Sequence, residues 1–125
     1  MTERVYDLED RLVEFGSRII DVVEALPNTR AGNYIAGQLV RCGLAPALLY
    51  GEAQGAESRD DFIHKMKILL KELKETRVCL KLIIKKEMIK PVNRLNEVRK
   101  ECEDLIKISS KSIETAKQNN RKPKN

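Results

Sequence analysis

Asp61 and His64 have the carboxylate-x-x-His spacing that places two metal ligands on one face of a helix. A di-iron bundle needs this pair twice, together with acidic ligands from all four helices. His64 is the only histidine in the sequence. We therefore expect no metal site and no cofactor, and we interpret His64 as a surface or interface side chain.

The single histidine also limits catalytic chemistry, because no nucleophile, base and orienting acid can be assembled around it. The sequence contains no glycine-rich phosphate loop and no zinc-binding spacing. Cys42, Cys79 and Cys102 lack CxxC spacing and fall inside helical patterns, which indicates reduced thiols in the core. We expect no catalytic residues and no enzymatic activity.

A polar group lies inside an otherwise apolar stretch, residues 32–56, whose only charges are Arg41 and Glu52. These two residues are about three helical turns apart and share one flank with Tyr34 and Gln38. A charge left unpaired in such an apolar setting is costly. We expect these side chains to satisfy one another or a neighbouring helix across an interface.

Lysines supply a third kind of chemistry, the neutralisation of phosphates. Residues 1–56 hold five basic and eight acidic side chains, a net charge of −3, whereas residues 57–125 hold nineteen and eleven, a net charge of +8. The basic stretches lack aromatic residues for stacking on bases, so we expect weakly sequence-specific and strongly salt-dependent binding. The candidate nucleic-acid-binding residues are Lys67, Lys71, Lys74, Lys81, Lys85, Lys107 and Lys111.

Apolar residues at steps of three and four define the helices that position these side chains. The first helix ends at Pro27 and Asn28, and the second begins near Asn28 or Thr29 and contains Pro46, which should kink it. The first buries Leu8, Leu12, Phe15, Ile19, Val22 and Leu26, and the second buries Ile35, Leu39, Cys42, Leu49 and Ala53.

A capping box formed by Ser58 and Asp61 starts the third helix, which ends before Pro91. The fourth helix begins at about Val92. The third buries Phe62, Met66, Leu69, Leu73, Leu80 and Ile83, and the fourth buries Leu95, Val98, Cys102, Leu105, Ser109, Ile113 and Ala116.

These four amphipathic helices with short connections predict an all-α, antiparallel up-down-up-down four-helix bundle over residues 1–116. Residues 117–125 hold four basic residues and no apolar anchor, which favours a basic disordered tail. The first ten residues are polar and acidic, unlike a secretory signal, and charges interrupt residues 32–56 too often for a membrane span. We expect a cytoplasmic protein that does not bind membranes.

The outward faces of the helices indicate self-assembly. The first helix presents a line of acids and the third a line of lysines, while the second presents small and apolar residues. Opposite charges on diagonal helices favour a head-to-tail contact that closes into a ring. The alternative is that the charged lines are ordinary solvated faces. The candidate interface residues are Val40, Leu44, Ala47, Arg41, Glu52, Asp10, Glu14 and Asp21.

Three sequence blocks carry a family resemblance, QLVRCG at 38–43, YGEAQGAESRDDFIHKMKI at 50–68 and KELKET at 71–76. This pattern resembles the bacterial four-helix-bundle proteins named after the protein encoded in intervening sequences of large-subunit ribosomal RNA genes. Gln38, Arg41 and Glu52 match polar positions of that family, but Ala45 and Leu49 stand where its members commonly have Ser and Asn.

The resemblance implies an up-down bundle that assembles into a homopentameric ring without enzymatic activity. It also implies kinship with the accessory proteins of diversity-generating retroelements, which bind nucleic acid and a reverse transcriptase. We therefore expect a ring-forming accessory factor that binds nucleic acid with a protein partner, such as a reverse transcriptase or a ribosomal component. The alternative is a structural homo-oligomer that serves only a protein partner.

Overall fold

The computed structural model of the chain describes residues 7–121, which fold into four α-helices and one short 3-10 helix. The predicted all-α fold is confirmed, since these residues contain no strand. The elements are α1 (Leu8–Ala25), α2 (Arg30–Gln54), α3 (Arg59–Lys85), η1 (Val92–Leu95) and α4 (Asn96–Arg121).

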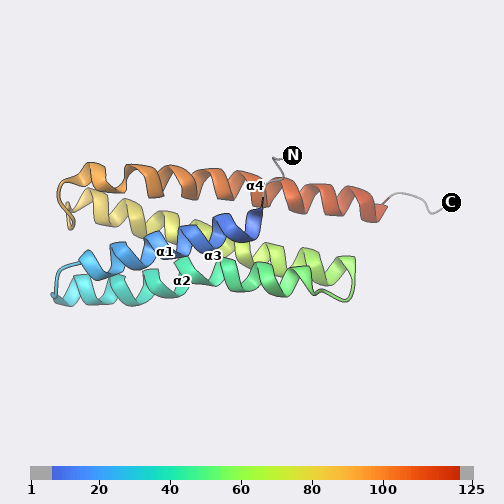
Figure 1. Cartoon of the computed structure of the whole chain (residues 1–125), viewed down its shortest axis with the longest axis horizontal. Helices are drawn as coiled ribbons and strands as arrows, with labels where there is room; N and C mark the ends of the chain where they lie inside the picture. Colours follow the sequence, from blue (N-terminus) through green and yellow to red (C-terminus); the bar gives the residue numbers. More distant parts are fainter. Residues whose placement is uncertain (1–6, 122–125) are drawn as a thin grey trace.

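The helices run up and down in an elongated antiparallel bundle (Figure 1). Both α1 and α3 pack against α2 and α4, so α1 and α3 occupy diagonal positions. Helix α1 has 18 residues, whereas the other three have 25 to 27. At a rise of about 1.5 Å per residue, α1 is roughly 10 Å shorter than its neighbours. The end of the bundle where α2 meets α3 is therefore built from three helices (Figure 1).

Side-chain caps start three of the helices. The Asp7 carboxylate accepts a hydrogen bond from the Asp10 amide, and the Ser58 hydroxyl accepts one from the Asp61 amide, as the capping box predicts. Thr29 caps α2 by accepting from the Gly32 amide at 3.0 Å. A Cβ atom at Gly32 would lie 2.1 Å from the Pro27 carbonyl oxygen, so this tight turn requires glycine.

The core contains nearly all of the residues that apolar spacing predicts. Phe62, Leu26, Ile35 and Leu49 are only half-buried, although each packs against the core, and Ile63 takes the deeper position next to Phe62. The buried side chains at the centre include Leu12, Phe15, Ile19, Leu39, Met66, Leu69, Leu73, Leu80, Ile83, Leu95 and Leu105.

The last helix differs from the prediction at both ends. Its expected first turn, from Val92, is the 3-10 helix η1, which follows Pro91. At the other end α4 continues to Arg121, beyond the boundary expected at Ala116, because Lys117 and Gln118 are strong helix formers and no breaker precedes Pro123. The remaining residues of the predicted tail, 122–125, lie outside the described residues.

Glycine allows α1 and α2 to approach closely. A Cβ atom at Gly43 would lie 2.6 Å from Cγ2 and 3.0 Å from Cγ1 of Ile19, which is fully buried. A β-branched side chain in a packed core has little freedom to move away. Gly43 is therefore a packing requirement of the α1–α2 contact.

The substitution Gly43→Ala should destabilise the protein by ~1–3 kcal/mol, because the overpacking cost exceeds the gain in helix propensity. Gly37→Ala is the matched control. Gly37 lies in the same helix, and apart from its chain neighbours and the backbone of its own helix no atom lies within 4 Å of the position that a Cβ would take, so alanine should stabilise by about 0.5–1 kcal/mol. Urea unfolding measures both changes. Equal effects of the two substitutions would contradict the close contact.

Candidate functional site

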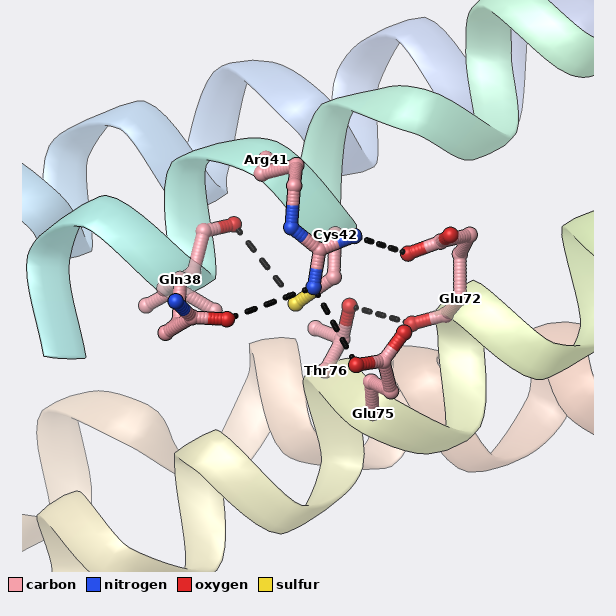
Figure 2. A network of polar contacts seen from close by, with 7 residues as sticks. Gln38, Arg41, Cys42, Glu72, Glu75 and Thr76 are labelled. Atoms are coloured by element: carbon pink, nitrogen blue, oxygen red, sulfur yellow. Dashed lines mark hydrogen bonds and ion pairs between the residues drawn. The ribbon is translucent and has the colours of Figure 1, made fainter.

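Arg41 joins α2 to α3 through two carboxylates. Its Nη1 atom lies 2.9 Å from Oε1 of Glu72 and its Nη2 atom 3.1 Å from Oε2 of Glu75, while Gln38 Oε1 accepts a longer bond of 3.4 Å (Figure 2). The hydrogen bonds to Glu75 and Glu72 raise the pKa of Arg41. Two of the sequence blocks, at 38–43 and 71–76, therefore meet in one polar cluster.

Glu52, the other charge of the apolar stretch, also pairs with α3. Lys65 donates from Nζ to Oε1 of Glu52 at 2.8 Å. Arg41 and Glu52 thus find partners on the neighbouring helix of the same chain rather than in each other. The Arg41 and Glu52 side chains remain 49% and 53% exposed. Both could therefore also contact a second molecule.

Thiols lie beneath this cluster. Cys42 is fully buried next to Arg41, and Cys79 on α3 is half-buried. Interaction with the Cys79 thiol lowers the pKa of Cys42 to about 7, against the opposing effect of burial, and interaction with Cys42 raises the pKa of Cys79. The Cys42 thiol donates to the Leu39 carbonyl at 3.9 Å. Cys102 on α4 donates to the Leu73 carbonyl at 3.4 Å, and burial raises its pKa to about 12.

Five of the seven predicted lysines lie around two adjacent hollows on α3 and α4. A hollow on α3 is lined by Lys67, Lys71 and Lys74, and a second hollow between α3 and α4 is lined by Lys107 and Lys111. Leu70 contributes to both hollows, so the lysines of α3 and α4 lie on either side of it. We define the basic surface as the exposed residues Lys67, Lys71, Lys74, Lys81, Lys85, Lys107 and Lys111.

These seven lysines make no ion pair with a carboxylate in residues 7–121. By contrast, Lys65 and Arg41 on the α2–α3 contact are both paired. Glu75 and Glu114 also line the two hollows, but the lysines outnumber them, so the basic surface presents net positive charge on the outside of α3 and α4, as phosphate binding requires.

The apolar outer face expected on α2 is narrower than predicted. Val40 is 38% exposed, but Leu44 and Ala47 are half-buried against the core of their own chain. The reason is that α1 covers this side of α2, where Leu44 lies against Gly16. Most of the surface of Leu44 and Ala47 is thus covered within the same chain, and Val40 alone of the three is exposed.

Sequence reasoning missed the exposed apolar residues of α1. Val13 and Ile20 are 56% and 43% exposed and lie seven positions apart, on one side of the helix. They adjoin the acidic line formed by Asp10, Glu14 and Asp21, which are exposed as predicted. Two β-branched residues at heptad spacing beside a line of acids are the signal that could have found them.

The structure also locates the remaining candidates. His64 is exposed on α3, and within residues 7–121 no three His, Cys, Asp or Glu side chains are grouped to hold a metal ion. None of the described helices is long and apolar enough to cross a membrane.

Comparisons with known proteins give a consistent family. The sequence profile described as 23S rRNA-intervening sequence protein matches residues 6–111. A solved structure from Bacteroides thetaiotaomicron, described as a protein with unknown function from the S23 ribosomal protein family, is similar with a TM-score of 0.79 and 30% identity. The similarity covers 86% of this chain and 98% of that chain. No curated protein matches this sequence.

Loss of the Arg41 cluster should lower the melting temperature by a small amount. Exposed ion pairs contribute little, but Arg41→Ala leaves the largely buried carboxylate of Glu72 without its cation. Adding Glu72→Gln should recover part of the loss, which a double-mutant cycle measures by thermal unfolding. Arg99→Ala, at an exposed position of α4, is the control. Strict additivity of the Arg41 and Glu72 changes would contradict the pairing.

Proposed function

This chain belongs to the 23S rRNA-intervening sequence protein family, and from that premise we propose that it is a non-catalytic accessory protein that binds nucleic acid. The observation that carries the proposal is the basic surface, in which unpaired lysines of α3 and α4 flank Leu70. From Lys67 to Lys85 the surface extends over about 27 Å of helix, enough to follow several phosphates.

The chemistry of this surface favours recognition of the nucleic-acid backbone. Lysine is a point charge that neutralises phosphates without reading base edges. The hollows of the basic surface are lined by Leu70, Val78, Ile106 and Ile113 but by no aromatic side chain on which a base could stack. Structured RNA is the natural first ligand because the family description refers to ribosomal RNA.

Assembly into a ring, which we propose to be a pentamer, is the second part of the proposal. Val13, Ile20 and Val40 are exposed apolar residues on the neighbouring helices α1 and α2. The acidic line of α1 and the lysines of α3 lie on diagonal helices, so they face different directions and can pair between copies. Such a ring would act as a scaffold for a protein partner, for example a reverse transcriptase or a ribosomal component.

A structural homo-oligomer that serves only a protein partner is the competing function. It is favoured by the same exposed apolar residues, and it differs in requiring no affinity for nucleic acid. Both the ring contact and nucleic-acid binding would use the lysines of α3. If the ring contact uses them, Lys107 and Lys111 on α4 remain accessible.

Fluorescence anisotropy against a structured RNA and a DNA duplex, each at two salt concentrations, tests the nucleic-acid proposal. The triple variant Lys67→Gln, Lys71→Gln, Lys74→Gln should bind at least roughly tenfold more weakly at low salt. For this variant, the slope of log affinity against log salt concentration should be smaller in magnitude by about 2–3. The control removes the same charge at exposed positions elsewhere, through Arg30→Gln, Lys90→Gln and Arg99→Gln.

Two results would contradict this proposal. One is the absence of binding by the unmodified protein even at low salt, which would leave the structural homo-oligomer. The other is equal weakening by the two triple variants, which would place binding outside the basic surface.

Sedimentation velocity at micromolar concentration and moderate salt tests the ring. The protein should sediment as an assembly, and Val13→Lys should shift it toward the monomer by placing a charge in an apolar contact. Thr115→Lys, a β-branched residue replaced at an exposed position of α4, should leave the assembly intact. A monomeric unmodified protein would remove the proposed ring.

A further inference from the structure

A hollow of about 170 Å³ lies between α1 and α4, at the end of the bundle where the chain turns from α3 into α4. The contact between α1 and α4 is the least extensive of those between neighbouring α-helices, which leaves room for this hollow. One side is a single face of α1, whose lining residues recur at steps of three and four. The other side comes from the turn after α3, from η1 and from the first turn of α4.

The floor of this hollow is apolar. It consists of four buried aliphatic side chains, each at most 8% exposed: Val22, Ile89, Leu95 and Val98. Since a protein cavity of about 150 Å³ can hold benzene, this hollow has room for an aliphatic group of about four to six carbon atoms. Placing such a group on the floor is favourable because it removes apolar surface from water.

The rim of the hollow carries two positive and two negative groups. Arg18 and Arg94 supply guanidinium groups, whereas Asp21 and Glu97 supply carboxylates. A ligand with a net charge would be attracted by one pair and repelled by the other. A zwitterion gains from both pairs at once, because its carboxylate can accept from a guanidinium and its ammonium group can donate to a carboxylate.

Two of these four groups retain the most bonding capacity. Arg94 donates one long hydrogen bond, 3.5 Å from its Nη1 atom to the Lys90 carbonyl oxygen, and pairs with no carboxylate in residues 7–121. The Asp21 carboxylate forms no ion pair within the same part of the chain. By contrast, Nη1 of Arg18 lies 3.8 Å from Oε1 of Glu97. Arg94 and Asp21 are therefore the most available groups for the two charges of a ligand.

We propose that this hollow is a binding site for a free α-amino acid with a branched aliphatic side chain, such as leucine. Arg94 holds the carboxylate of the ligand, Asp21 holds its ammonium group, and the aliphatic side chain packs on the apolar floor. The site is independent of the proposed nucleic-acid function, because the hollow and the basic surface share no residue.

An NMR titration of the full chain with leucine tests the proposal. The methyl resonances of Val22, Ile89 and Val98 should shift and saturate, with a Kd between about 10 μM and 1 mM, as expected for a small ligand in a partly exposed site. Two analogues each remove one charge. The oxo acid 4-methyl-2-oxopentanoate lacks the ammonium group and 3-methylbutylamine lacks the carboxylate, so both should bind at least roughly tenfold more weakly.

Matched variants at exposed positions assign the contacts. Arg94→Gln should weaken leucine binding at least roughly tenfold, and Asp21→Asn should weaken the binding of leucine but not that of the oxo acid. Ala25→Leu should fill the hollow and block it. The control is Arg99→Gln, which removes a charge of α4 outside the hollow and should leave the affinity unchanged.

Asp21→Asn also changes the acidic line of α1, whereas Arg94→Gln leaves that line intact, so a loss of binding in both variants reports on the hollow. The proposal is overturned if leucine shows no saturable binding up to about 10 mM. It is equally overturned if the oxo acid binds as tightly as leucine, or if Arg94→Gln binds leucine as the unmodified protein does.

Discussion

The contact between α2 and α3 is the constraint on which the rest of this molecule depends. Helix α2 carries few charges, so most of its surface must be covered, and α3 supplies the most extensive cover. Apolar packing alone would tolerate a shift of one helix along the other, but Arg41 and Lys65 each pair with a carboxylate across the contact at a defined level. Arg41 and Glu52 are each about half exposed, so these pairs contribute modest free energy, and their main effect is to select one register. In that register the lysines of α3 are exposed on the outside of the bundle.

The helices and their core follow from local rules, which explains how closely they could be predicted. Apolar residues at steps of three and four, a threonine cap and a capping box act over a few residues and need no knowledge of the partners. The error at Leu44 and Ala47 has the opposite origin. We assigned one buried stripe to α2, but a helix in a bundle has two neighbours, and the glycine at Gly43 lets α1 approach closely enough to cover a second side.

The candidate site could be predicted only in part because its residues come from different helices. Each lysine of the basic surface was identified from the pattern of its own helix. That the lysines of α3 and α4 lie on either side of Leu70 depends on how these helices pack. Glu72 and Glu75 appeared in the sequence only as charges beside a line of lysines, and nothing local marks them as partners of Arg41.

The short first helix bears on whether one set of lysines can serve both a ring and a nucleic acid. Helix α1 lies toward the end of the bundle that holds the last turns of α3, where Lys81 and Lys85 are found (Figure 1). Lys67, Lys71 and Lys74 lie toward the three-helix end, next to Lys107 and Lys111 of α4. An acidic line carried on the 18 residues of α1 spans about 27 Å, so in a neighbouring copy it could follow the lysines of α3 from Lys67 to Lys85 but not those of α4 beside them. A ring contact along α3 would therefore leave Lys107 and Lys111 of α4 accessible, so the proposed assembly and the proposed nucleic-acid binding are compatible in one molecule.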